Sequence, residues 1–239
     1  MRRDLLAATA LTTTMAMLTG GAQSQEYDWT GFYAGFALGG AAGGEATFDY
    51  PSPGFYDNFP EALPLRGFGG GSLSVGYNAQ SGQFVFGAEA DKTLALTLEN
   101  SFAEVDNTDV PTDESLNIRQ TLNLFTFRGR GGVAFDRLLL FGTAGLAAAN
   151  STLEANAAFD TGTTKGSTTG SSTDILFGFV AGGGVEYALK DDARIEIEAL
   201  YFDLTDQSVT TEPGILESFD ATSNSRGVIV RTGINIPFN

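Results

Sequence analysis

The chain has 239 residues, and its 29 acidic residues outnumber its 13 basic residues to give a formal charge of −16. An acidic excess of this size argues against a nucleic-acid partner, because phosphate binding requires a basic surface. The chain contains no cysteine and no histidine. This excludes disulfides, thiolate metal sites and a lipid anchor on cysteine, and it removes the commonest general base and transition-metal ligand.

The first 24 residues have the pattern of a secretory signal peptide. A basic start and an apolar stretch over residues 5–18 precede a segment of small residues. We expect cleavage near Ala22 or Ser24, which leaves residues 25–239 as one mature domain. The apolar stretch is too short for a membrane-spanning helix, and no other segment comes closer. If the protein lives in a membrane, it must therefore cross with strands.

Strand-like segments follow, joined by seven connections that alternate strictly between short and long. The three short connections lie at residues 78–82, 136–137 and 190–192. The four long, polar connections lie at roughly residues 43–66, 99–120, 152–172 and 207–225. Seven connections imply eight strands. Tight turns at one rim with large loops at the other are typical of an outer-membrane β-barrel.

Each strand sorts its residues by parity, which is expected when the two faces of a sheet meet different surroundings. In the third strand, even positions such as Phe84 and Phe86 are apolar, whereas odd positions include Glu89 and Asp91. The fourth, sixth, seventh and eighth strands repeat this separation. The charged face carries both signs, at Glu89, Asp91, Arg128, Arg130, Glu186, Arg194, Glu196, Glu198 and Arg231.

Alternation alone fits a soluble barrel with an apolar interior or a membrane barrel with an apolar exterior. Aromatic residues beside the short turns favour the membrane barrel, because a ring of aromatics at one level matches an interfacial girdle. The predicted girdle consists of Trp29, Tyr77, Phe84, Phe135, Tyr187 and Phe238. We therefore predict an all-β fold, an eight-stranded antiparallel up-and-down transmembrane β-barrel over residues 25–239.

The interior of an eight-stranded barrel is just wide enough for side chains to fill. Unpaired charges there would cost several kcal/mol per ion. We therefore expect the arginines of the charged face to bridge its acids across the lumen. The predicted ion network comprises Glu89, Asp91, Arg128, Arg130, Glu186, Glu196, Glu198 and Arg231. The alternative interpretation is a row of solvated charges in a wet pore.

Three segments depart from the regular pattern. Leu200 and Phe202 break the parity of the seventh strand, which predicts a bulge or a position above the membrane. Residues 161–172 are low in complexity and predict a flexible loop. Aromatic residues in the first long connection, among them Phe48, Tyr50 and Phe59, predict a lid over the barrel mouth.

The segment Trp29-Thr30-Gly31-Phe32-Tyr33-Ala34-Gly35 resembles the first strand of small porin-like outer-membrane proteins of Gram-negative bacteria. These belong to the superfamily of the opacity proteins and the transmembrane domain of outer-membrane protein A. Residues 86–91, 127–142, 182–188 and 231–238 resemble further strands of the same family, in the same order. The resemblance implies that the terminal aromatic residue signals to the barrel-insertion machinery. Here Asn239 follows Phe238, which departs from the family pattern.

We expect a structural role in the cell envelope, with outer-membrane lipids and the insertion machinery as partners. The alternatives are a narrow porin for ions or small solutes, and a surface adhesion or recognition protein acting through its long loops. We expect no enzyme activity, catalytic residue, metal or cofactor. Asp203 and Asp206 form a paired-acid candidate that we interpret as solvated loop acids. The sequence indicates no oligomeric state.

Overall fold

The computed structural model describes residues 27–50, 59–67, 69–106, 112–190, 193–213 and 217–238. The predicted signal peptide lies outside these residues. The strands are β1 (Gly31–Asp49), β2 (Ala62–Gly67), β3 (Gly70–Ser81), β4 (Phe84–Asp106), β5 (Thr112–Phe135), β6 (Leu138–Asp160), β7 (Lys165–Lys190), β8 (Ala193–Leu204), β9 (Gln207–Thr210), β10 (Asp220–Asn224) and β11 (Arg226–Phe238). Among the described residues, no helix is long and apolar enough to span a membrane.

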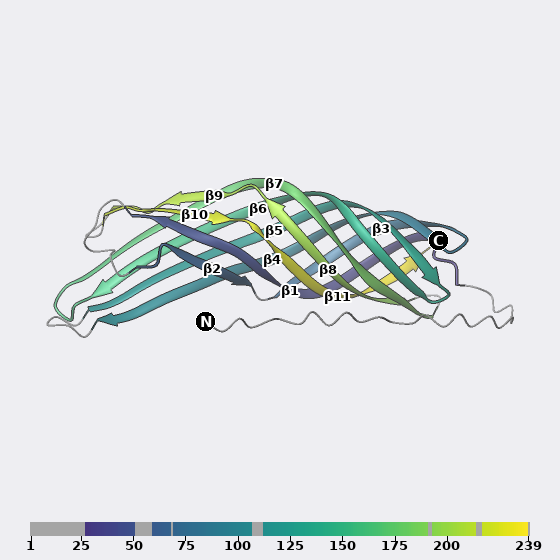
Figure 1. The fold of residues 1–239 in the computed structure, drawn as a ribbon, viewed down its shortest axis with the longest axis horizontal. Coiled ribbons are helices and arrows are strands. Elements are labelled where there is room, and N and C mark those ends of the chain that lie inside the picture. The colour runs from purple at the N-terminus through teal and green to yellow at the C-terminus, as the bar shows by residue number, and fades with distance from the viewer. Residues whose placement is uncertain are drawn as a thin grey trace, which may run out of the picture.

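Eight strands close into a ring of antiparallel neighbours (Figure 1). Their order around the ring is β1, β3, β4, β5, β6, β7, β8 and β11. The closing ladder between β1 and β11 runs from Phe32 opposite Phe238 to Ala42 opposite Val228. The short strands β2, β9 and β10 extend the wall at the outer end. The predicted eight-stranded antiparallel barrel is confirmed.

One half of the barrel has an apolar outer surface. Phe127, Leu146 and Phe179 lie opposite one another on β5, β6 and β7, and all three point outward with 49% or more of their surface exposed. Large apolar side chains continue this belt on the other strands of the ring. A continuous apolar surface of this kind is stable against hydrocarbon and unstable against water. This half is therefore the membrane-spanning part.

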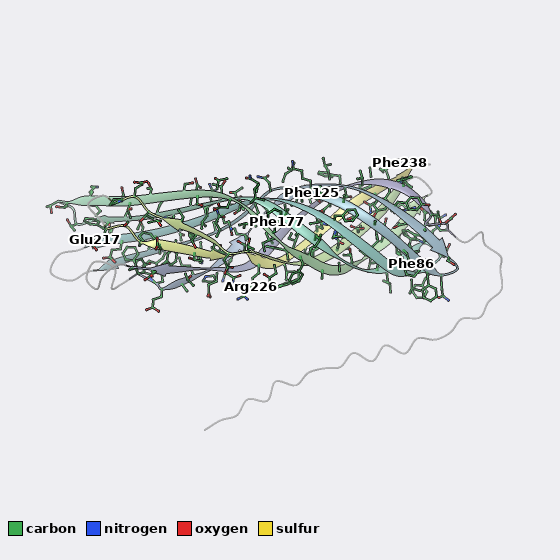
Figure 2. The ribbon with its side chains drawn as sticks, turned by 90° about the horizontal axis from the view of Figure 1, so that it is seen from above. Phe86, Phe125, Phe177, Glu217, Arg226 and Phe238 are labelled. Carbon is green, nitrogen blue, oxygen red and sulfur yellow. The ribbon has the colours of Figure 1, made fainter. Side chains whose placement is uncertain are left out.

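Beyond the belt, the same alternate positions still point outward and inward, but the chemistry of the two faces is exchanged. The outward positions become polar and the inward positions become apolar. On β5, outward Phe125 is followed toward the outer end by Asn123 and Arg119, whereas inward Leu124 and Ile118 are buried. The outer half thus has a polar surface around an apolar core, as a soluble barrel has. Figure 2 labels Phe86, Phe125, Phe177 and Phe238 along the apolar half, and Arg226 and Glu217 along the polar half.

This reversal accounts for Leu200 and Phe202. Of the two predicted explanations, a bulge or a position above the membrane, the bulge is wrong, because the ladder between β8 and β11 runs through both residues without a register shift. Both side chains point into the barrel and are buried, with at most 1% of their surface exposed. They lie where the interior changes from charged to apolar. The parity of the strand is therefore intact, and only the chemistry of its inward face changes.

The strands extend much further than the long connections of the sequence suggested. β4 continues to Asp106 and β5 begins at Thr112, within the predicted loop at residues 99–120. The predicted flexible loop at residues 161–172 is also wrong, since β7 begins at Lys165 and only four residues separate it from β6. At that tip, a hydrogen bond from Lys165 lowers the pKa of the Asp160 carboxyl.

Two irregularities lie near the transition between the halves. The ladder between β4 and β5 shifts register between Thr93 and Leu96, and the ladder between β1 and β2 shifts between Ala42 and Glu45. Gly43 has a φ of +125°, and a Cβ there would lie 2.7 Å from the Cα of Gly227. Only glycine fits this position. Irregularities of this kind change the local twist and bend of a strand.

The position of the belt can be tested on β6, where Leu146 and Asn156 point outward in the two halves. Leu146→Arg places a charge against hydrocarbon and should lower the free energy of unfolding by about 2–4 kcal/mol. Asn156→Arg on the same face should change it by less than about 0.5 kcal/mol. Urea unfolding in lipid vesicles measures both. Equal effects would contradict the assignment of the two halves.

Candidate functional site: the filled lumen

The charged face of the strands points into the lumen of the membrane-spanning half. β4 contributes Glu89 and Asp91, β5 contributes Arg128 and Arg130, and β11 contributes Arg231. The remaining members are Glu186 on β7 and Arg194, Glu196 and Glu198 on β8. All nine side chains are buried. Strand parity therefore delivers charges from five strands to the barrel axis.

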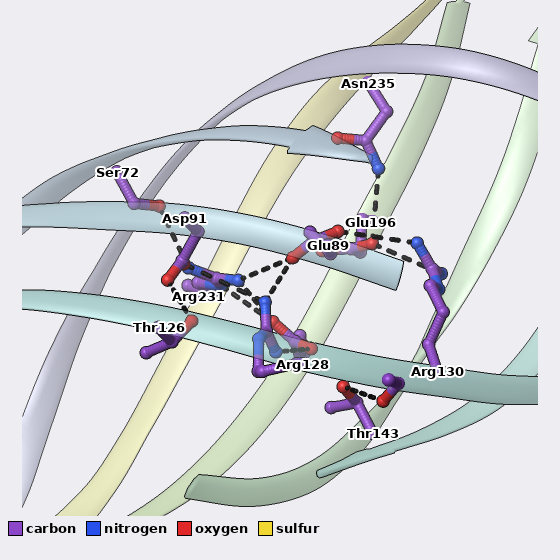
Figure 3. Close-up of polar contacts among 12 residues, drawn as sticks. Ser72, Glu89, Asp91, Thr126, Arg128, Arg130, Thr143, Glu196, Arg231 and Asn235 are labelled. Atoms are coloured by element: carbon purple, nitrogen blue, oxygen red, sulfur yellow. Dashed lines mark hydrogen bonds and ion pairs between the residues drawn. The ribbon is translucent and has the colours of Figure 1, made fainter. Parts of the chain in front are cut away.

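The network consists of two linked groups of ion pairs, and Arg128 lies at the centre of the first group (Figure 3). Its Nη1 lies 2.6 Å from Glu198 Oε1, and its Nη2 donates to Glu89. Arg231 reaches the same Glu198 with its Nη2, 2.7 Å from Oε2, and also donates to Asp91. Thr126 donates to the second oxygen of Asp91 at 2.6 Å. Each carboxylate in this first group therefore accepts from at least two donors.

Arg130 lies at the centre of the second group of ion pairs. Its Nη2 lies 2.8 Å from Glu186 Oε2, and its Nη1 donates to the Tyr33 hydroxyl at 2.8 Å. The Tyr33 hydroxyl donates in turn to Glu89 Oε2 at 2.6 Å, which links the two groups. The amide of Asn235 donates to Glu186 and Glu196 at 3.0 and 3.2 Å.

The predicted pairing is confirmed, since Arg128, Arg130 and Arg231 bridge acids from β4, β7 and β8. The sequence interpretation missed Tyr33 and Asn235 as members of the network. Both lie on the charged face by parity, but their side chains carry no charge and so were not selected. A search for any polar residue on that face would have found them.

The network carries five carboxylates and four guanidinium groups, which leaves a formal excess of one negative charge. Its packing is tight: a Cβ on Gly76 would lie 2.4 Å from the ring of Tyr33. Among the described residues, a few buried polar atoms have no hydrogen-bond partner. These are both amide atoms of Asn78, the Nε atoms of Arg128 and Arg130, and Nη1 of Arg194. Such atoms are the places where isolated water molecules bind in protein interiors.

A second layer closes the lumen at the end that carries the short turns. Trp29 is fully buried, and its indole nitrogen donates to the carbonyl of Asp136 at 3.0 Å. The guanidinium of Arg194 lies 4.9 Å from the Trp29 ring and donates to the Tyr27 hydroxyl at 2.8 Å. Small and apolar side chains complete this layer, namely Val85, Ala134, Leu139, Phe141 and Ala188.

The predicted place of Trp29 in the aromatic girdle is therefore wrong. The segment before β1 turns inward across the turn between β5 and β6, where the Asp136 carbonyl satisfies the indole N–H. The other five members of the proposed girdle point outward near the same rim, with 41–53% of their surface exposed. They are Tyr77, Phe84, Phe135, Tyr187 and Phe238.

A third, apolar layer fills the outer half and is crossed by one polar bridge. Gln120 of β5 donates to Ser151 at 3.0 Å and to Ser225 at 2.8 Å. Gln207 of β9 accepts from Ser151 at 2.5 Å. This bridge ties the outer strands to the wall. It also satisfies polar groups that would otherwise destabilise an apolar interior.

Aromatic side chains cover the outer end of this layer. Phe48 and Phe59 are buried, and the ring of Tyr50 lies 5.4 Å from that of Phe219 and 6.2 Å from that of Phe59. The predicted aromatic lid is confirmed for Phe48, Tyr50 and Phe59. The remaining aromatics of that connection lie outside the described residues.

Comparison with known proteins agrees with this architecture. A family model described as "Outer membrane protein beta-barrel domain" matches residues 7–224. A 22 kDa outer membrane protein of Rhizobium leguminosarum bv. viciae is 28% identical over 204 residues, which is 85% of this chain and 78% of the relative.

Two solved structures are also similar. The outer membrane protein OprG from Pseudomonas aeruginosa has a TM-score of 0.54 at 10% identity, and the match covers 88% of this chain and 97% of OprG. This likeness supports the fold alone. The outer membrane protease OmpT from Escherichia coli has a TM-score of 0.40 at 10% identity, covering 90% of this chain and 99% of OmpT.

Arg128→Ala tests the energetic role of the network. The substitution leaves Glu89 and Glu198 facing one cation fewer in a buried site, so it should lower the free energy of unfolding by about 3–5 kcal/mol. Arg119→Ala is the matched control, because the 3.0 Å pair between Arg119 and Glu99 is exposed and contributes at most about 1 kcal/mol. Urea unfolding in detergent compares them. No loss of stability in Arg128→Ala would contradict the paired network.

Proposed function

The chain belongs to the outer membrane protein β-barrel domain family, and we propose that it serves as a closed structural barrel supporting the cell envelope. Its location is the outer membrane. The single observation that carries the proposal is that side chains fill the lumen at three successive levels. Trp29 marks the first, Arg128 the second, and the apolar core around Leu122 the third.

The paired charges favour closure over conduction. In a conducting pore, charged groups face water and leave a continuous path between them. Here Arg128, Arg130 and Arg231 each contact two or more carboxylates, and each is at least nine-tenths buried. A solute would have to break these pairs to pass. A narrow pore remains the first alternative and a surface recognition role the second.

We also propose that the protein is not an enzyme. Hydrolytic centres in proteins commonly require a histidine base, and the chain has none. Of the two acids considered as a catalytic pair, Asp203 accepts a hydrogen bond from the Tyr201 hydroxyl at 3.0 Å on the outer surface. We interpret both acids as solvated surface groups.

The proposed partners are the lipids around the belt and the barrel-insertion machinery. β11 supports the second of these, because Ile234, Ile236 and Phe238 point outward and are about half exposed along the last strand. We propose that the insertion machinery recognises this apolar outward face of the last strand.

Single-channel recording in planar bilayers tests the structural role against the porin. The wild-type barrel should show no steady openings, because the network and the Trp29 layer block the axis. The double substitution Arg130→Ser with Glu186→Ser removes one cation and one acid, which leaves the formal charge of the network unchanged, and it should give small steps. Gel migration before and after boiling checks that both proteins are folded. Steady, reproducible openings of the wild-type protein would contradict the closed barrel.

A further inference from the structure

A polar groove of about 570 Å³ lies on the outer wall above the apolar belt, across β2, β4, β5 and β6. Its floor is a row of directly opposite charged residues. Arg66 faces Glu99, Glu99 faces Arg119, and Arg119 faces Glu154. A second row follows at the next outward position toward the tips, where Ser101 faces Asn117 and Asn117 faces Asn156.

Exposed basic residues cluster in this sector of an acidic protein, where the arginines alternate with Glu99 and Glu154. Arg66, Lys92 and Arg119 lie on the neighbouring strands β2, β4 and β5, and all three side chains are exposed on the outer wall. Elsewhere on the described outer wall of this half, the basic residues are scattered. Arg226 lies on β11 opposite Asp203, and Lys165 is paired with Asp160 at the tip of β7. The groove itself carries two cations and two acids in alternation, and Lys92 adds a third exposed cation below it, in contrast to the acidic excess of the whole chain.

The guanidinium groups are available to a ligand. The Nε of Arg119 donates to Glu99 at 3.0 Å, but both side chains are 57% exposed, and an exposed pair of this kind is weak. Within the described part of the chain, Arg66 makes no ion pair. Planar guanidinium groups bind phosphate oxygens with two parallel hydrogen bonds.

The height of the groove above the hydrocarbon determines which phosphate groups can reach it. Lys92 lies opposite Phe125, and the exposed Leu94 ends the apolar belt of β4 one outward position above it. Arg119 lies about four residues beyond Leu94, so at about 3.4 Å per residue and a tilt of about 40° it stands roughly 10 Å above the hydrocarbon. The head-group layer of an ordinary bilayer is only about 5–8 Å deep on each side. A phospholipid phosphate therefore lies below the groove.

We propose that this groove binds the phosphorylated saccharide head of an outer-leaflet glycolipid, that is, lipopolysaccharide. Arg66 and Arg119 bind its phosphates, and Lys92 reaches the phosphate nearest the acyl chains. The row of Asn117 and Asn156 hydrogen-bonds sugar hydroxyls, and Glu99 and Glu154 accept from such hydroxyls between the two cations. The proposal goes beyond the structural role, because it holds whether or not the lumen conducts.

Binding by the full-length barrel held in amphipol tests the proposal. The probe is rough lipopolysaccharide with a phosphorylated inner core, measured by interferometry on the immobilised protein. Arg66→Ser with Arg119→Ser should raise Kd by about tenfold or more, because two charge-assisted contacts are lost. Lys165→Ser is the matched control, since it removes an exposed cation at the tip of β7, where Lys165 pairs with Asp160 of β6, six residues from Glu154 of the groove. It should change Kd by less than about twofold.

Two further ligands identify the chemistry that is recognised. The same lipopolysaccharide with its phosphates removed should bind about tenfold more weakly to the wild-type protein. Vesicles of phosphatidylglycerol should also bind more weakly and should not distinguish the double variant from the wild type. The proposal is overturned if the double variant binds as the wild type does, if Lys165→Ser loses as much affinity, or if phosphatidylglycerol binds as tightly. Heat-dependent gel mobility confirms that each variant is folded.

Discussion

The narrow interior of an eight-stranded barrel is the constraint on which the rest of this structure depends. Such a barrel encloses only enough space for its own inward side chains. Strand parity sends every second residue into that space, so the inward residues must satisfy one another. Below the outer half they do so as ions, with Arg128, Arg130 and Arg231 each shared between carboxylates. The proposed closure of the lumen rests on this packing alone and invokes no separate plug domain.

The outer surface of the barrel meets hydrocarbon along one half and water along the other. Against hydrocarbon the wall presents Phe125 and Phe127, and against water the same face of the same strand presents Arg119 and Asn117. The inward face changes in the opposite sense, from Arg128 to Leu122. The membrane half holds its charges inside and the outer half holds its apolar side chains inside. One continuous set of strands therefore combines a membrane barrel with the core of a soluble one.

Strand number, face assignment and the ion network were predictable from the sequence, because parity and short turns are local signals. The outer half was not, because its outward residues are threonine, serine and asparagine. In a run such as residues 161–172, that composition looks like a loop. On each strand of the outer half, inward apolar residues alternate with these outward polar residues, as they do in the membrane half with the chemistry exchanged. The strands continue there because they form ladders with segments that are distant in the sequence. Trp29 was misplaced for a related reason. Its burial is decided by Asp136, a contact across 107 residues that no local pattern reports.

Site-directed spin labelling along β5 distinguishes a lumen filled by paired side chains from a wet pore, and the absence of native cysteines allows single labels. We expect three classes of position in lipid bilayers. Labels at Phe125 and Phe127 should meet oxygen but not a water-soluble nickel chelate, labels at Asn117 and Arg119 should meet the chelate, and labels at Leu116 and Leu122 should meet neither. Chelate access at the inward positions would show a wet lumen, and access at Phe127 would show a water-facing wall. Either result would rule out a filled barrel with an apolar belt against lipid.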